Sequence, residues 1–578
     1  MTTTVTFDDR GRVTSKSRPG SPSISYAYPD EWTTTVTANG LDTISVYDGF
    51  HRLQSLTKPT GSGTSIVQKL TYDVYGRLVS LRETTSAGST RNETWAYDAL
   101  DRPISHAPLA GAATTTAYRA SGINTQTTTT LSNGTATSVL KDPFGQTVLV
   151  TTPDGTQNAS TYDEFGNQTT LSVVPITGGS QTRTWTFDPL GRLTSKTEPE
   201  TNTQVFKAFN ALNQPTSITE AYGTADARER ILTYDGFGRL RTMENGETRL
   251  SYDYSGVNLT FSSRRAVGGS TVQQSFTYAG AGGRLSSEST IQPGLTTTIG
   301  YDYDASTGNL KALTYPSGRV VGYGYDALGR VTSISNNGAT LVNNVIYDEW
   351  GNRHQTQFAS GSQDQWDADL SGARLKAWNI GYVGGGPDGR SYLYDDATNV
   401  LKTAGEWSLV HDNMGRLTEA DGFGLKTAHG YDAFGNATYH LATPNGSTVP
   451  ATFNNFTFNP TPNNQIPGQE SNGALTGWNT NLRGEATQVG TATASGTALA
   501  LGWDGLGALS SVAWSGGNQS YLYAPSGMRV STVDVVNASN NRKYAYTSSG
   551  LLLSELDGPV QSVHGGKKRY EFLTIQQG

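Results

Sequence analysis

The sequence contains no cysteine among its 578 residues, and charged side chains make up only 16% of it. The absence of cysteine excludes disulfide bonds, cysteine-ligated zinc and thiol catalysis. The net charge of −7 is small for this length and no basic stripe is visible, which argues against nucleic acid as the main partner. No run of about 18 apolar residues occurs, so no transmembrane segment is predicted.

Targeting and catalytic motifs are also missing. The start, MTTTVTFDDRGRV, has no basic region followed by an apolar stretch, so no Sec signal peptide is visible. The seven histidines form neither HExxH nor another close pair of metal ligands, and GYVGGGPDG (381–389) lacks the Lys-Ser/Thr of a phosphate loop. No GxSxG elbow is present. We therefore expect no metal, no cofactor and no enzyme activity.

Glycine, threonine, serine and tyrosine are abundant instead. The 67 glycines are about 12% of the chain, against a usual ~7%. With few helix-forming runs, this composition favours strands and turns. The chain also exceeds the roughly 250–300 residues at which a single compact core stops growing. Several domains or a repeat fold are therefore expected.

One motif recurs along the chain: an aromatic residue, aspartate, two variable residues, glycine, and then arginine or asparagine. YDVYGRLVSL, YDGFGRLRTM, YDALGRVTSI, FDPLGRLTSK and YDEFGNQTTL are examples. Tyr47, Tyr72 and Tyr97 are each 25 residues apart, and most later spacings lie between 20 and 26. Such a period indicates an array or solenoid. The series continues at Tyr162, Phe187, Phe209, Tyr234, Tyr252, Tyr278, Tyr303, Tyr325, Tyr347, Tyr394 and Tyr431, with weaker copies at Phe458, Trp478, Trp503, Tyr523 and Tyr546.

Each copy predicts a strand, a tight turn and a second strand. Another apolar residue usually stands two positions before the aromatic, as Leu70 precedes Tyr72, which is the period of a half-buried strand. In the four residues of the turn, aspartate stands first, proline is tolerated second, and glycine stands fourth. This pattern is the signature of a type I turn. His51, Asp101 and Asn213 replace the glycine in three copies, and these residue types favour positive φ. We predict a left-handed residue that closes a hairpin, as in a type I turn with a following bulge.

The turn residues are interpreted as structural. The recurring aspartate caps the N–H groups of its own turn and is not a catalytic carboxylate. The arginine or asparagine bonds neighbouring turns, with an anionic ligand as the alternative, and the aromatics pack in the sheet, with stacking on sugar rings as the alternative. The predicted turn residues are Tyr47, Asp48, Tyr72, Asp73, Gly76, Arg77, Tyr162, Asp163, Gly166, Phe187, Asp188, Gly191, Arg192, Tyr234, Asp235, Gly238, Arg239, Tyr325, Asp326, Gly329, Arg330, Tyr347, Asp348 and Gly351.

The segments YPSGRVVGYGYDALGRVTSI (315–334) and YDEWGNRHQT (347–356) resemble the YD repeats of bacterial Rhs proteins. Similar repeats occur in the C component of insecticidal toxin complexes and, more distantly, in teneurins. The resemblance extends from about Phe7 to about Leu556. It implies an all-β fold, in which a long antiparallel sheet of YD-repeat hairpins spirals into a hollow solenoid or barrel-like shell. Such an architecture lets 578 residues form one unit without one solid core.

The resemblance also implies function. Family members commonly enclose a C-terminal toxic polypeptide, or form an extracellular surface for adhesion and carbohydrate contact. In the toxin-bearing members an Asp-Pro-containing core segment after the repeats acts as an aspartyl autoprotease. Asp142 and Asp188 lie in ordinary mid-chain repeats, and no such segment follows the repeats here, so we do not assign the protease residues. A shell without an autoprotease core or a toxin domain is expected.

One continuous YD-repeat domain is expected over residues 1–556, with irregular excursions near 355–392 and 440–475. Within the first excursion, QDQWDADLSGARLKA (363–377) favours a short helix. Residues 557–578, which include GGKKRY, are expected to form a loosely ordered, solvated tail.

Three functions remain open from the sequence. The leading hypothesis is a non-enzymatic shell, secreted or at the cell surface, that encloses or displays a polypeptide such as a toxin. It predicts an interior of several thousand cubic ångströms, well above a ligand pocket of roughly 300–1,000 Å³. The alternative is a secreted or cell-surface protein that binds a glycan through exposed aromatic rows. A glycosidase or aspartyl protease would need two carboxylates about 5–10 Å apart in a cleft.

Overall fold

The fold was determined from a computed structural model. It describes residues 2–61, 63–109, 111–279, 283–369, 372–381, 388–444, 456–458, 468–471, 474–489, 498–557 and 568–571. These residues form 51 strands and one short 3-10 helix, Ala538–Asn540. The predicted all-β class is therefore confirmed.

The strands form one antiparallel ribbon in chain order, because each strand pairs with the one before it and the one after it. The first half of the ribbon comprises β1 (Thr4–Phe7), β2 (Val13–Ser17), β3 (Ile24–Ala27), β4 (Thr33–Ala38), β5 (Leu41–Tyr47), β6 (Leu53–Gly61), β7 (Thr64–Tyr72), β8 (Leu78–Thr85), β9 (Thr90–Tyr97), β10 (Pro103–Ala107), β11 (Thr114–Ser121), β12 (Asn124–Leu131), β13 (Ala136–Lys141), β14 (Thr147–Thr151), β15 (Gln157–Tyr162), β16 (Gln168–Val174), β17 (Gln181–Phe187), β18 (Leu193–Glu198), β19 (Asn202–Phe209), β20 (Pro215–Glu220), β21 (Arg228–Tyr234), β22 (Leu240–Glu244), β23 (Arg249–Ser255), β24 (Asn258–Arg265), β25 (Thr271–Ala279) and β26 (Arg284–Gln292).

The second half continues the same pattern. It comprises β27 (Leu295–Tyr303), β28 (Leu310–Thr314), β29 (Val320–Tyr325), β30 (Val331–Asn336), β31 (Ala339–Tyr347), β32 (Arg353–Phe358), β33 (Gln363–Ala368), β34 (Leu375–Gly381), β35 (Asp388–Tyr394), β36 (Leu401–Ala404), β37 (Trp407–His411), β38 (Leu417–Gly422), β39 (Leu425–Tyr431), β40 (Ala437–Pro444), β41 (Phe456–Phe458), β42 (Gly468–Ser471), β43 (Ala474–Thr480), β44 (Ala486–Val489), β45 (Leu499–Trp503), β46 (Leu509–Trp514), β47 (Gly517–Tyr523), β48 (Arg529–Asp534), β49 (Arg542–Tyr546), β50 (Leu552–Asp557) and β51 (Lys568–Glu571).

We call the turns that connect an odd-numbered strand to the next strand corners, and in the described residues most of them are formed by YD motifs. In the corner between β7 and β8, the Gly76 N–H donates to the Asp73 carbonyl at 3.0 Å, and the Asp73 N–H donates to the Arg77 carbonyl at 3.0 Å. The ladder register shifts at Tyr72, as a bulge requires. His51, Asp101 and Asn213 have φ values of 58°, 62° and 60°, so the left-handed conformation predicted at these three positions is present.

The left-handed corner position predicts the effect of a substitution. Gly191 has a φ of 73°, and an added Cβ would meet no atom within 4 Å, so only backbone strain opposes a side chain there. We expect Gly191→Val to lower the free energy of unfolding by about 1–2 kcal/mol. Gly191→Asn should cost less, since Asn213 already occupies an equivalent position. Urea unfolding measures both, and Gly49→Ala, at a corner glycine without positive φ, is the matched control. Equal costs for valine and asparagine would contradict the interpretation.

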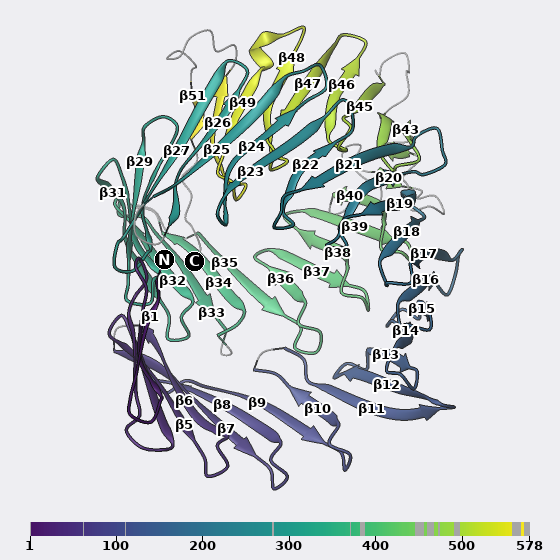
Figure 1. Cartoon of the computed structure of the whole chain (residues 1–578). Helices are drawn as coiled ribbons and strands as arrows, with labels where there is room; N and C mark the ends of the chain where they lie inside the picture. Colours follow the sequence, from purple (N-terminus) through teal and green to yellow (C-terminus); the bar gives the residue numbers. More distant parts are fainter. Residues whose placement is uncertain are drawn as a thin grey trace.

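The ribbon winds into two stacked tiers. In Figure 1 it runs from the purple strands at the bottom, up through the blue strands, across the top through β21–β27, and back through the green strands to the yellow ones. We call β1–β26 the first tier and β27–β51 the second tier. Corners of the second tier lie on the first tier's opposite edge, which holds the connections after even-numbered strands. Examples are Asn39 Nδ2 to the Ala327 carbonyl (3.1 Å) and Thr85 Oγ1 to Glu349 Oε2 (2.6 Å).

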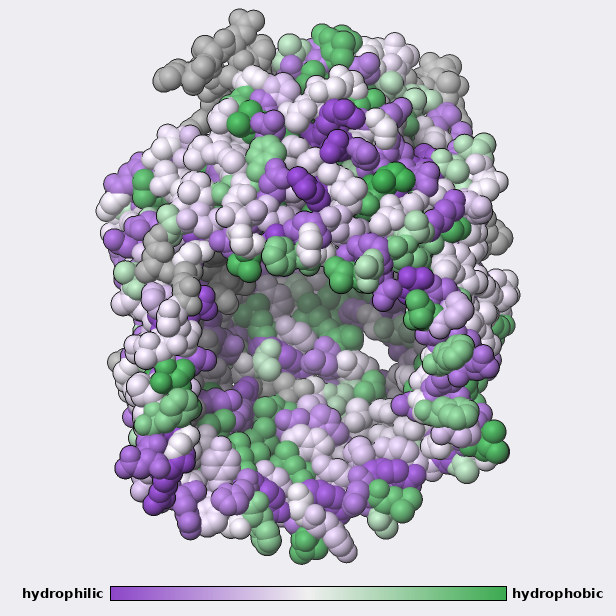
Figure 2. Space-filling model, in the orientation of Figure 1, coloured by the Kyte–Doolittle hydropathy of each residue, from purple (hydrophilic) through white to green (hydrophobic). Residues whose placement is uncertain are grey.

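The spiral encloses a hollow rather than a solid interior. Its accessible surface is 30640 Å², against about 20,000 Å² expected for a compact protein of 61.6 kDa. Figure 2 shows the molecule hollowed between its lower and upper parts. A solenoid-like shell of one spiralling sheet accounts for both observations. The volume of the hollow stays a prediction.

Buried apolar side chains gather where successive turns of the spiral overlap. The largest cluster contains Ile299, Leu313, Tyr315, Val321 and further residues of β27–β31, together with Leu553 of β50. A smaller cluster joins Val272 of the first tier to Ala524 and Val530 of the second. The core of this protein is therefore distributed along the contacts between successive turns of the spiral.

Three expectations need correction. The segment 363–377 does not form a helix: β33 and β34 pair across it, with Trp366 opposite Trp378. The repeat aromatic assigned to Tyr252 is instead Tyr254, where the register shifts before a tight turn. Lys568–Glu571 form β51, which pairs with β50, so this part of the tail is not loosely ordered. The rest of the tail beyond residue 557 and most of 445–473 lie outside the described residues.

Candidate functional site

The corner aspartate holds its own turn together. Asp73 Oδ1 accepts hydrogen bonds from the N–H groups of Tyr75 (2.9 Å) and Arg77 (3.0 Å). Its Oδ2 forms an ion pair with Arg77 Nε at 2.7 Å. Where asparagine replaces the arginine, its amide takes over the contact, as Asn167 Nδ2 does to Asp163 Oδ2 at 2.9 Å.

The corner arginine links one hairpin to the next. Arg77 Nη1 donates to the Asp98 carbonyl at 3.0 Å and contacts Asp101 Oδ1 at 2.8 Å. Its guanidinium also lies over the ring of Tyr97 in the next repeat, 5.0 Å from the ring centre. The same stacking recurs where Arg330 covers Tyr347 at 4.0 Å. Cation–π contacts of this kind add attraction between adjacent hairpins.

The repeat tyrosine completes the link. The Tyr72 hydroxyl donates to the Leu53 carbonyl, the first strand residue after the preceding corner, at 2.8 Å. Equivalent bonds run from Tyr97 to Leu78, Tyr162 to Thr147, Tyr234 to Pro215, Tyr325 to Leu310, Tyr347 to Val331 and Tyr431 to Leu417. Phe187 has no hydroxyl, so its corner cannot make this bond. The predicted turn residues thus form a ladder along the ribbon's corner edge, which is interrupted where phenylalanine replaces tyrosine.

The corner contacts lower the pKa of some of the corner aspartates, such as Asp48 and Asp395. For Asp48 the side-chain hydrogen bond from Arg52 has the largest effect and, with backbone N–H donors, holds the pKa below its usual value against the opposing effect of partial burial. For Asp395, hydrogen bonds from Lys402 and Thr398 lower the pKa to about 2. These carboxylates are charged at neutral pH, and each is occupied by its own corner.

These shifts predict acid lability. A carboxyl group whose pKa is lower in the folded state stabilises the fold above its unfolded pKa, and this stability is lost as the pH falls toward the folded pKa. For Asp395 the window runs from the ordinary value of 3.8 down to about 2. We expect the thermal midpoint, followed by circular dichroism, to fall steadily across this window. Asp395→Asn should reduce the slope, and a midpoint independent of pH from 5 to 2 would contradict the prediction.

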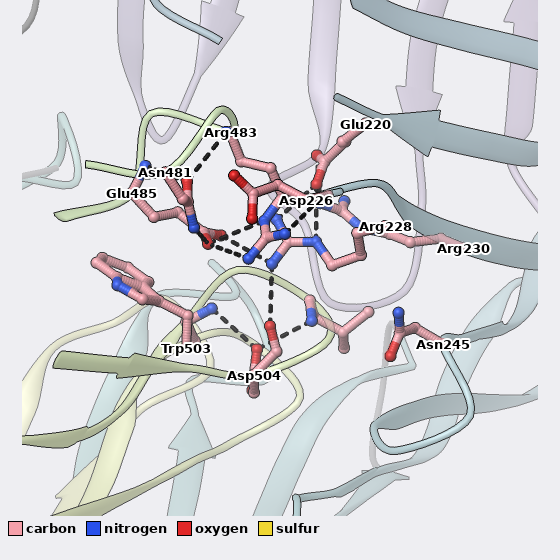
Figure 3. A network of polar contacts seen from close by, with 12 residues as sticks. Glu220, Asp226, Arg228, Arg230, Asn245, Asn481, Arg483, Glu485, Trp503 and Asp504 are labelled. Carbon is pink, nitrogen blue, oxygen red and sulfur yellow. Dashed lines mark hydrogen bonds and ion pairs between the residues drawn. The ribbon is translucent and has the colours of Figure 1, made fainter. Parts of the chain in front are cut away.

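A second polar site lies at the seam between tiers, shown in Figure 3. Arg228 on β21 donates to Glu220 Oε2 within the first tier, through Nε at 2.9 Å. Its Nη1 donates to the Asp504 carbonyl in a second-tier corner at 3.0 Å and forms an ion pair with Glu485 Oε1 at 2.7 Å. Asp226 Oδ2 accepts from the Leu482 N–H at 2.8 Å. The seam is therefore joined by charged groups from both tiers.

Asp504 is a deeply buried carboxylate of this seam. Its Oδ1 caps the N–H groups of Leu506 and Ala508, and its Oδ2 forms an ion pair with Arg264 on β24. Both side chains are at most 6% exposed. A further seam contact is made by Glu288, whose carboxylate accepts the Ser548 N–H at 3.0 Å and the Tyr301 hydroxyl.

Sequence reasoning missed the seam residues. Arg228, Arg264 and Glu288 lie outside the YD motif, and nothing in their neighbourhood marks them. It also missed the pairing of His429 with His440, which face each other across β39 and β40 with 3.3 Å between their Nδ1 atoms. Burial first, and then the neighbouring His440, lower the pKa of His429. Within the described ranges no group of three or more His, Asp or Glu side chains is placed to hold a metal ion.

One segment of the chain matches a known protein family. A family model described as RHS Repeat matches residues 303–340, which span the corners at Asp304 and Asp326. A search of curated proteins finds no match to the sequence. In the part of the chain that is described, no helix has the length and apolar character needed to cross a membrane.

Several solved structures share the fold. A Tc holotoxin pore of Photorhabdus luminescens with a substitution in TccC3 has a TM-score of 0.61 and 13% identity, over 93% of this chain and 32% of that one. The crystal structure of TcdB2-TccC3-TEV has a TM-score of 0.52 and 14% identity, over 96% of this chain and 30% of that one. The crystal structure of TcdB2-TccC3 without its hypervariable C-terminal region has a TM-score of 0.52 and 13% identity, over 95% of this chain and 30% of that one. This chain spans about a third of their length. The chain therefore contains an RHS repeat at residues 303–340 and shares its spiral fold with these toxin-complex structures.

Proposed function

We propose that this chain is a non-enzymatic shell that encloses or displays another polypeptide, of the toxin-cocoon type. The observation that carries the proposal is the hollow spiral of a single sheet, whose surface exceeds that of a compact protein by about half. A wall one sheet thick around an open interior suits a cargo larger than a small ligand. A toxic polypeptide is the partner we propose, with the shell secreted or at the cell surface.

The corner chemistry supports a structural role. A carboxylate that acts as an acid or nucleophile needs access to substrate, whereas Asp188 is held by Arg192 at 2.6 Å and by two N–H groups of its own corner. The repeated tyrosines are engaged in the same way, since an arginine covers the ring and the hydroxyl donates to a carbonyl. These contacts also weigh against the ladder as a glycan platform, and retention on a glycan array would reopen that alternative.

Protease protection tests enclosure. An unstructured reporter peptide is fused to the C-terminus of the full chain and digested with a nonspecific protease. We expect digestion at least about tenfold slower than for the same reporter on a compact, unrelated carrier, because cleavage requires access to an extended backbone. Equal rates for the two carriers would overturn enclosure.

A matched variant tests whether the wall provides the protection. Arg264→Met removes the cation that pairs with Asp504 across the seam. We expect the reporter on this variant to be digested faster than on the unaltered shell, while Arg249→Met, at an exposed ion pair, leaves the rate unchanged. An unchanged rate in Arg264→Met, despite a measured loss of stability, would show that the protection does not come from the wall.

A further inference from the structure

The first tier presents an unbroken row of apolar side chains along its corner edge. Each corner from β5–β6 to β23–β24 carries one large apolar residue at its tip, and all are exposed, from 59% for Leu212 to 92% for Val257. We call this row the corner rim. Its members are Phe50, Tyr75, Leu100, Ile123, Phe144, Phe165, Leu190, Leu212, Phe237 and Val257.

Equivalent positions in the second tier are less exposed, because those corners lie on the first tier. Leu328 and Met414 are 37% and 41% exposed. The ring of Trp350 lies under the guanidinium of Arg91 from the opposite edge of the first tier, 4.1 Å from the ring centre. The corner tip is therefore the part of the repeat that seats on another sheet edge.

The corner rim also contains a groove. Between the corners at Asn210 and Asp235 lies a groove of about 760 Å³, lined by Leu212, Ile231 and Leu232 among others. Ten exposed large apolar side chains along one edge are uncommon on a soluble monomer, which favours an interaction surface.

The other end of the spiral carries a complementary edge. The connections after even-numbered strands of the second tier include Phe423, between β38 and β39, and Val535 and Val536, after β48. These side chains are 65%, 68% and 67% exposed. In the first tier, the corresponding edge contacts the second-tier corners.

We propose that the corner rim binds the exposed opposite edge of a second copy of this chain, head to tail. The contact would repeat the packing seen between the two tiers, with the rim residues in the position that Trp350 occupies within one molecule. Because the two surfaces differ, the association is heterologous and extends into stacks rather than stopping at a symmetric dimer. The inference does not depend on cargo.

Sedimentation velocity of the full chain, from low to high micromolar concentration, tests the proposal. We expect species larger than the monomer that grow with concentration. The rim variant Phe144→Ser/Phe165→Ser/Phe237→Ser should raise the dissociation constant by about tenfold or more, since aromatic side chains dominate such interfaces. Serine suits this turn position, so the corners should still form. A wild-type chain that remains monomeric throughout would overturn the proposal.

Two further variants identify the partner surface. Phe423→Asn/Val535→Thr alters the opposite edge and should weaken association to a similar degree, with asparagine suited to the φ of 52° at Phe423. Leu393→Thr/Val410→Thr, at exposed strand positions outside the corner tips and the opposite edge, is the matched control and should change nothing. Association that is lost in the rim variant but intact in the edge variant would mean rim-to-rim pairing and overturn the head-to-tail arrangement. Equal loss in the control would overturn the rim itself.

Discussion

Replacing Arg264 with methionine is expected to lower the free energy of unfolding by about 3–5 kcal/mol, because it leaves the buried carboxylate of Asp504 without its cation. Arg264 and Asp504 are 6% and 4% exposed and come from different tiers. Urea unfolding followed by tyrosine and tryptophan fluorescence measures the loss. Hydrogen exchange at the amides of Leu506 and Ala508, which donate to Asp504, should show where the structure opens.

Two controls separate burial from the loss of a cation. Arg249→Met removes an arginine 47% exposed and 3.6 Å from Glu244, and should cost at most about 1 kcal/mol. The double variant Arg264→Met/Asp504→Asn keeps an oxygen to cap the corner and removes the unpaired charge. We expect it to be more stable than Arg264→Met alone. A double variant less stable than the single one would contradict a charge-based explanation.

Leu553→Ala is expected to cost about 2–5 kcal/mol, the range for a buried leucine whose removal leaves a cavity. Leu553 is fully buried and packs in the cluster of β27–β31, so its loss affects the contact between the end of the spiral and the sheet beneath. Thermal and urea unfolding measure the change. Because the side chain lies at the overlap, proteolysis should attack the strands after β48 before the first tier.

The neighbouring Leu551 provides the comparison. It is 36% exposed, so Leu551→Ala should cost less than about 1 kcal/mol. Leu553→Met, which keeps most of the volume, should lose less than about 1.5 kcal/mol. Similar losses for Leu551→Ala and Leu553→Ala would mean that the overlap contributes little to stability.

The corners were predictable because their chemistry is local. An aspartate, a glycine and an arginine within five residues fix the turn, and the residue types that replace glycine at His51, Asp101 and Asn213 are themselves enough to indicate positive φ. The spiral itself followed from the family resemblance and not from the spacing. The error at Tyr252 arose because two tyrosines flank Asp253, and only the register decides which one closes the repeat.

The seam was not predictable for a physical reason. Arg264 and Asp504 are 240 residues apart, and neither belongs to a pattern that points to the other. The same holds for Glu288 and Ser548, 260 residues apart. The helix expected over 363–377 failed because an isolated helix of about 15 residues is marginal, whereas pairing with both neighbouring strands satisfies every backbone group of a strand.

The distance along the chain between seam partners has a consequence for biosynthesis. Hairpins joined by corners need only neighbouring residues, so they can form as soon as they leave the ribosome. The first seam contacts join residues up to 288 apart, such as Asn39 and Ala327. At a synthesis rate of about 5–20 residues per second, roughly 15–60 s pass before the second tier covers the opposite edge of the first tier. During that interval its seam charges and apolar overlap residues are exposed to solvent, and chaperone binding is expected to concentrate there.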